Sequence, residues 1–180
     1  MIRFLLRATI VGAAVGWIAD RWLASRGGGR GPEPIRSMVV IDVPIERVWR
    51  ELADVEGQPR WMHDMKSVRV LTSGAIGVGT RAEADVRIFG MAVVDPIEIT
   101  VFEPPTRFAI RHEGQFTGEG LIELEPGADR STTIVRWDET LIPPYLPHLA
   151  AALLRPILER VFQLDLERLR ELVEADPAGA

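Results

Sequence analysis

The feature that most constrains the fold is a long, one-sided apolar segment near the end of the chain, between residues 148 and 174. At about 100° per residue, its apolar side chains form one stripe and most of its charges lie on the other side. Such a helix is stable mainly because something covers its apolar side. Strand-like segments precede it, so we expect a β-sheet to be the cover. The predicted stripe consists of Ala150, Leu153, Leu154, Ile157, Leu158, Val161, Leu164, Leu169 and Leu172.

Two charged residues, Asp165 and Arg168, fall on the apolar side of this helix. One interpretation is that they form a pair at the solvent-exposed end of the stripe. The other is that both reach an internal cavity, where charged groups would have a chemical use. The two interpretations differ in a way that a structure can test.

Composition limits the class of protein. A chain of 180 residues with 47% hydrophobic content can form one packed domain plus an extra element. The net charge is −5 and the basic residues are interspersed with acidic ones, so nucleic-acid binding is not expected. The chain has no cysteine, which removes disulfides and thiolate chemistry. His63, His112 and His148 are far apart and lack metal-ligand spacing, so we expect neither a metal nor another cofactor.

The first 25 residues form a hydrophobic helix outside the main pattern. Their longest uncharged run, Ala8 to Ala19, has 12 residues, which is shorter than the roughly 20 that cross a bilayer. Trp17 and Trp22 are typical of a membrane interface. We favour a membrane anchor, either spanning or interfacial, with the following domain in the cytoplasm. A cleaved signal peptide and an extra helix packed on the domain are the alternatives.

Glycine and proline make residues 26–36 a linker, and the globular domain is expected over residues 37–174, followed by a tail at 175–180. The domain begins with a β-branched strand from Ser37. Pro44 to Ala53 has helical spacing, and a second short helix or turn carries Trp61. Six further strands then follow on short turns, which predicts an antiparallel sheet curled around the terminal helix. These six strands are expected at residues 67–71, 80–89, 91–102, 107–113, 116–125 and 132–141.

Several motifs in this order resemble the START-like, or helix-grip, superfamily (SRPBCC), and most closely its polyketide cyclase/dehydrase branch. They are IDVPIERVWRELADVEGQPRWM at 41–62, GVGTR at 77–81, FEPPTRFAIR at 102–111 and LERLRELVE at 166–174. The resemblance implies an α+β helix-grip fold with a curled seven-stranded sheet, a long C-terminal helix and two short helices after the first strand. It also implies a ligand between the sheet and that helix. Members include ligand carriers, aromatase/cyclases and lipid-transfer modules, so the fold does not decide the activity.

Strand alternation selects the side chains that would face this ligand. The glycines among them either make room for the ligand or allow the strand to curve. Trp61, after the short helices, would provide a flat apolar wall or plug the core. The predicted ligand-binding residues are Trp61, Phe108, Ile110, His112, Phe116, Gly118, Gly120, Trp137, Ile157 and Val161.

The same alternation places His112 and Glu139 inward as polar groups in an apolar cavity. There they would suit general acid/base chemistry in an aldol cyclisation or dehydration. Alternatively, both lie at the cavity mouth, solvated or paired with an arginine. A third strand separates theirs, so direct contact between them is not expected. With Asp165 and Arg168 they complete the set of catalytic candidates.

Three functions fit the sequence. The favoured one is noncatalytic, cofactor-free binding of a hydrophobic lipid-like or polycyclic molecule by a domain tethered to a membrane. The second is a cofactor-free polyketide cyclase or dehydratase that uses the same cavity. The third is an interaction module whose cavity is closed. The sequence leaves the ligand and the oligomeric state open.

Overall fold

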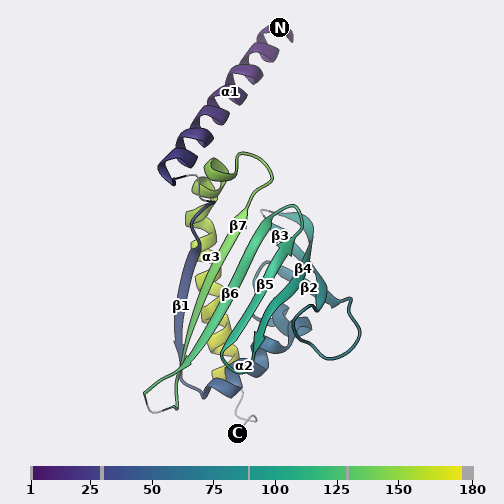
Figure 1. The fold of residues 1–180 in the computed structure, drawn as a ribbon, viewed down its shortest axis with the longest axis vertical. Helices are drawn as coiled ribbons and strands as arrows, with labels where there is room; N and C mark the ends of the chain where they lie inside the picture. Colours follow the sequence, from purple (N-terminus) through teal and green to yellow (C-terminus); the bar gives the residue numbers. More distant parts are fainter. Residues whose placement is uncertain (1, 29–30, 89, 129, 176–180) are drawn as a thin grey trace.

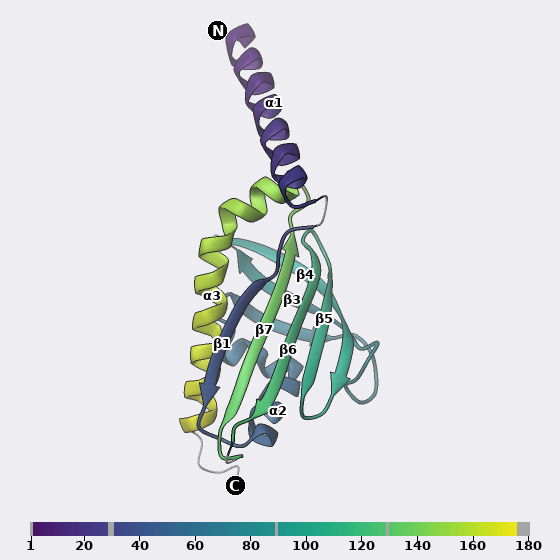
Figure 2. The ribbon, with the colours of Figure 1, turned by 60° about the vertical axis from the view of Figure 1, so that its left-hand side comes forward.

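The computed structural model describes residues 2–28, 31–88, 90–128 and 130–175. In this part of the chain, a seven-stranded antiparallel sheet in the order β1-β7-β6-β5-β4-β3-β2 curls beside the long helix α3, Pro147–Ala175 (Figures 1 and 2). The strands are β1 Ile35–Ile41, β2 Met65–Val70, β3 Arg81–Ile88, β4 Met91–Glu103, β5 Arg107–Glu113, β6 Thr117–Pro126 and β7 Thr133–Ile142.

The predicted helix-grip architecture is therefore confirmed. Two short helices follow β1, namely α2, Ile45–Ala53, and the 3-10 helix η1, Val55–Arg60. Helix α2 buries Val48, Trp49 and Leu52 on the face that its spacing predicted. The first strand begins at Ile35, two residues before the predicted start of the domain.

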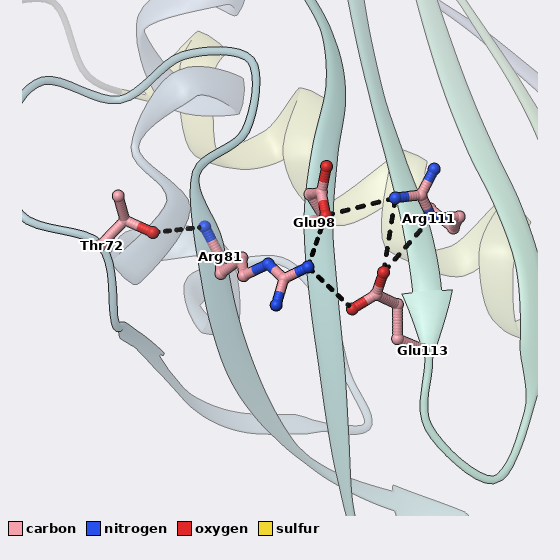
Figure 3. A network of polar contacts seen from close by, with 5 residues as sticks. All are labelled: Thr72, Arg81, Glu98, Arg111 and Glu113. Carbon is pink, nitrogen blue, oxygen red and sulfur yellow. Dashed lines mark hydrogen bonds and ion pairs between the residues drawn. The ribbon is translucent and has the colours of Figure 1, made fainter.

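The outer face of the sheet is charged, as the alternation in β3 predicted. Ala82 and Ala84 are buried, while the outward side chains of β3, β4 and β5 form a polar network (Figure 3). Glu98 of β4 lies between two guanidinium groups, 3.1 Å from Arg81 and 3.2 Å from Arg111. Glu113 extends the network, 3.4 Å from Arg111 and 3.9 Å from Arg81. Such exposed ion pairs each add little stability.

The apolar face of α3 differs from the predicted stripe. Leu166, Leu169 and Val173 are buried, whereas Leu153 is 67% exposed and Ile157 is 47% exposed. The buried face is rotated by roughly one position around the helix. The first turns of α3 extend past the sheet towards the N-terminal helix (Figure 2).

The N-terminal helix α1, Ile2–Arg26, projects from the end of the domain where α3 begins (Figure 1). Its carboxyl-terminal part docks there through Asp20, which is 7% exposed. The Asp20 carboxylate accepts hydrogen bonds from the backbone N–H groups of His148, at 2.8 Å, and Leu149, at 2.9 Å. It therefore satisfies two of the free donors at the start of α3. Among the described residues, no helix combines the length and apolar character needed to cross a membrane. Residues 176–180 of the predicted tail lie outside the described range.

Replacing Asp20 with alanine is expected to lower the free energy of unfolding by about 1 kcal/mol, because a capping carboxylate is lost. Amide hydrogen exchange should accelerate at His148 and Leu149, whose N–H groups lose their acceptor. Ser25→Ala, an exposed change in the same helix, is the matched control. Equal exchange in the two variants would contradict the capping role.

Candidate functional site

A cavity of about 140 Å³ lies between the inner face of the sheet, the segment after η1 and α3. A water molecule needs roughly 10–15 Å³ on this scale, so the space suits a small organic molecule. Its walls are mainly apolar, with a few acidic groups and one imidazole. The lining residues are Gln58, Met62, Asp64, Met65, Ala84, Val86, Val93, Asp95, Ile97, Ile110, His112, Phe116, Trp137, Glu139, Leu141, Leu158, Val161, Phe162 and Asp165.

His112, at the centre of the polar part of the wall, is held between two carboxylates. Its Nδ1 lies 2.6 Å from Asp95 Oδ2 on β4, and its Nε2 lies 2.9 Å from Glu139 Oε1 on β7. The indole N–H of Trp137 donates to Glu139 Oε2 over 2.8 Å. Glu139 is only 3% exposed, so this network is internal. Neither the His112 nor the Glu139 side chain is exposed at the mouth, and neither pairs with an arginine in the described part of the chain.

The contact between His112 and Glu139 contradicts the sequence prediction that the strand between them keeps them apart. In the sheet, His112 lies opposite Gly118 of β6, and Gly120 of β6 lies opposite Glu139. A Cβ on Gly120 would collide with the Glu139 carboxylate. Because β6 has no side chain at either position, the imidazole and the carboxylate meet across it. The glycines therefore serve the polar network more directly than they serve ligand volume.

The network fixes the charge of His112. Burial by itself would lower the pKa of this imidazole, but its hydrogen bonds to Asp95 and Glu139 and the negative charges of those carboxylates outweigh burial and raise the pKa to about 10. At neutral pH the ring is therefore a cation that donates from both nitrogens. It has no free lone pair with which to act as a base. The second oxygen of Asp95, Oδ1, is buried and has no hydrogen-bond partner among the described residues.

The two charges that interrupt the helix stripe are separated in the structure. Asp165 is 3% exposed, lines the cavity and accepts a hydrogen bond from the His63 N–H at 2.8 Å. Arg168 is exposed and donates to His63 Nδ1 over 2.9 Å. Burial raises the pKa of Asp165 to about 6, and the nearby charge of Asp64 also raises it. The prediction of a cavity-facing charge is correct for Asp165 and wrong for Arg168.

The raised pKa of Asp165 makes stability depend on pH. Because the folded value of about 6 lies above the unfolded value of 3.8, this group favours the fold below pH 3.8 and loses that contribution as pH rises through 6. The loss amounts to about 3 kcal/mol. We expect Asp165→Asn, which keeps an acceptor for the His63 N–H, to remove this decline in urea unfolding between pH 4 and 8. Asp138→Asn, on the outer face of β7, should retain it.

The other predicted ligand-binding residues fall into two groups. Ile110, Phe116, Trp137 and Val161 line the cavity as predicted. The remaining predicted side chains do not reach it. Trp61 and Phe108 are packed in the core, at 0% and 4% exposure, Ile157 points to solvent, and Gly118 and Gly120 act through the spacing that they leave.

Several lining residues were not predicted, notably Asp64, Met65, Asp95 and Phe162. The sequence could have indicated Asp95, because it lies two residues from the buried Ile97 in the same strand. Alternation therefore places both side chains on the inner face. Within the described residues, no group of three or more histidine or acidic side chains is arranged to hold a metal ion.

Comparison with known proteins agrees with this architecture. Residues 35–174 match the model of the family described as polyketide cyclase / dehydrase and lipid transport. None of the curated proteins compared matches the chain significantly.

Among solved structures, a protein from Thermus thermophilus has a TM-score of 0.64 and 25% identity, covering 81% of this chain and 99% of its own. A START superfamily protein from Mycobacterium smegmatis has a TM-score of 0.65 and 16% identity, covering 80% and 99%. The ZhuI aromatase/cyclase from a Streptomyces species has a TM-score of 0.63 and 18% identity, covering 82% and 98%. The last two likenesses concern the fold alone.

Proposed function

Because the chain belongs to the polyketide cyclase/dehydrase and lipid transport family, we propose that it binds a small, mainly apolar molecule in its internal cavity without transforming it. The observation that carries this proposal is the largely apolar cavity of about 140 Å³ between sheet and helix. Pockets of this composition hold ligands by burying their surface, while a few polar groups set orientation. A filled interior, which the interaction-module alternative requires, is not what the described residues form.

The state of the polar network favours binding over catalysis. The His112 ring engages a carboxylate at each nitrogen, and both oxygens of Glu139 are already hydrogen-bonded. A general base needs a free lone pair within reach of the substrate. The protonated His112 ring can therefore orient a ligand through its charge, but it holds no lone pair with which to accept a proton.

Filling the cavity tests the proposal. Val161→Trp places a large side chain in the cavity wall, whereas Leu153→Trp adds the same side chain to the exposed side of the same helix. Binding of 2-naphthylmethanol, a compact neutral probe, should be measured by calorimetry and by the rise in melting temperature that a native-state ligand produces. We expect binding to the wild type and Leu153→Trp and its loss in Val161→Trp. Equal binding to both variants, or to none of the three proteins, would refute the cavity as a binding site.

A cyclase or dehydratase is the second candidate function, and one observation favours it. Asp165 lines the cavity with a pKa of about 6, which suits proton transfer near neutral pH. A poly-β-ketone substrate should then be converted by the wild type with a rate that depends on pH around 6. Asp165→Asn should abolish that conversion. Absence of turnover in the wild type would remove this candidate.

Helix α1 places the domain at a membrane surface in this proposal. Its described part exposes Trp17, Ile18 and Trp22 at 60%, 60% and 52%. Asp20, the one acidic residue of α1, is buried against the start of α3, whereas Arg21 and Arg26 in the described part of the helix are exposed. Apolar and aromatic side chains beside arginines suit an interface that contains anionic lipid.

Vesicle sedimentation of the full chain tests this placement. Vesicles of phosphatidylcholine with phosphatidylglycerol should carry down the wild type more than vesicles of phosphatidylcholine alone. The double variant Trp17→Ser/Trp22→Ser should stay in solution. Tyr145→Ser, which removes an aromatic side chain that is 83% exposed outside α1, should behave as the wild type. Unchanged sedimentation of the double variant would contradict the role of α1.

A further inference from the structure

The charged side chains of the cavity wall are almost all of one sign. Four carboxyl groups line it, from Asp64, Asp95, Glu139 and Asp165, together with one imidazole from His112. The lining residues include no lysine and no arginine. The wall therefore offers many acceptors and an excess of negative charge, in surroundings where charges are poorly screened.

The single cation of the wall does not balance these acids. His112 is shared between Asp95 and Glu139, so its positive charge neutralises only one of the two carboxylates beside it. The Asp95 Oδ1 atom is left without a partner. At this part of the wall, two carboxyl groups therefore share one cation.

A second acidic pair lies where α3 faces the segment after η1. Asp64 and Asp165 both line the cavity, and the charge of Asp64 opposes ionisation of Asp165. The other charged or titratable groups facing Asp165 are His63, through its N–H, and Arg168, which is exposed. A bound cation would relieve this repulsion, because it would favour the ionised form of Asp165.

Aromatic side chains line the same cavity. Trp137 and Phe162 line the cavity with ring centroids 4.8 Å apart, and Phe116 contributes a third ring. Aromatic faces attract cations, most strongly where water is excluded. Carboxylates combined with aromatic rings form a wall that suits an apolar cation and has little to offer an anion.

We propose that the cavity selects a compact apolar molecule that carries a positively charged nitrogen, and that it rejects carboxylates of the same shape. This inference rests on the proposed binding function and specifies the class of its ligand. An anionic ligand would need a basic side chain or a free donor on the wall, and the His112 N–H groups are already occupied by Asp95 and Glu139.

Three probes of one shape test the inference, namely 2-naphthylmethylamine, 2-naphthylmethanol and 2-naphthoate. At neutral pH the amine should bind the wild-type chain about ten-fold more tightly than the alcohol, which corresponds to one favourable charge interaction. The carboxylate should bind at least about ten-fold more weakly than the alcohol. The affinity for the amine should also rise between pH 5 and 7.5, as Asp165 ionises.

A double variant that replaces two of the lining carboxyl groups with neutral amides tests their role in this selection. Asp64→Asn/Asp165→Asn keeps the shape of the wall and an acceptor for the His63 N–H, and it should reduce the preference for the amine and its rise with pH. Asp138→Asn, which removes a carboxylate on the opposite face of β7, should change neither. Binding of the alcohol should be similar in all three proteins, which shows that the cavity is intact.

The outcomes separate the two proposals. If the alcohol binds and the amine binds no better, or if the double variant keeps the full preference for the amine, the charge selection is wrong and the binding function stands. If none of the probes binds to the folded wild type, both proposals are refuted.

Discussion

Replacing His112 with alanine is expected to lower the free energy of unfolding by about 3–5 kcal/mol at neutral pH, because it breaks a buried charge network and leaves its partners unpaired. Asp95 and Glu139 would remain in the cavity wall without the cation between them. The Glu139 carboxylate, at 3% exposure, has little access to water in compensation. Chemical unfolding of the two proteins measures the difference.

The pH dependence identifies the cause of this loss. The folded pKa of His112, about 10, lies above the unfolded value of 6.5. The stabilisation is therefore complete below pH 6.5 and is lost as pH rises through 10. Wild-type stability should decline over that window, while His112→Ala should lack this part of the decline. His148→Ala, a histidine outside the network, should follow the wild type. A constant difference between wild type and His112→Ala from pH 6.5 to 10 would argue against a charged His112.

Gly118→Ala is expected to lower the free energy of unfolding by about 3 kcal/mol through strain and overlap in the backbone. Gly118 has a φ of 141°, a backbone conformation that residues with a side chain rarely adopt. A Cβ there would overlap the carbonyl oxygen of Thr140 on β7. Backbone atoms in a paired strand cannot move aside as a flexible side chain can. The β6–β7 pairing would therefore have to open locally.

Gly77→Ala is the control for this substitution. Gly77 has ordinary dihedral angles, and a Cβ there would meet open space, so the change should be neutral or slightly stabilising. Equilibrium unfolding of both variants, with hydrogen exchange at the β6 and β7 amides, compares them. Similar stability of Gly118→Ala and Gly77→Ala would show that β6 tolerates a side chain at this point.

Periodicity in the sequence predicted most of the fold and part of the site. Alternation in β5 and β7 placed His112 and Glu139 inward, and both line the cavity. The order of strands and helices followed from turn residues and apolar spacing, because each element buries one face. These are local signals, and they report which side of an element a residue occupies.

Contacts between strands depended on information that alternation does not contain. His112 and Glu139 meet because Gly118 and Gly120 place no side chains on the inner face of β6, the strand that separates β5 from β7. Alternation within a single strand indicates the face of the sheet to which a side chain points. It does not indicate which side chains are long enough to meet across an intervening strand. The two glycines stand out in the sequence, but their effect on the flanking side chains depends on the strand register, which only the folded sheet defines.

The face of α3 that is buried was predicted imperfectly for a related reason. Apolar residues occur around more of the helix than the sheet covers, so counting them shifted the stripe towards Leu153 and Ile157. Asp165 was recognised only as an irregularity, because hydropathy cannot distinguish a buried acid in a cavity wall from one at the surface.

The ion pairs on the outer face of the sheet have a consequence for its alignment. A shift of one residue between strands would turn apolar side chains outward, which burial forbids. A shift of two residues preserves burial, but in one direction it would bring Glu98 opposite Glu83 on β3 or Glu113 on β5, instead of Arg81 and Arg111. Like charges in such positions repel. A slipped β5 would also move His112 by about 7 Å from its carboxylates. The surface charges, which add little to stability, thus disfavour one of the slipped alignments in which the interior network could not form.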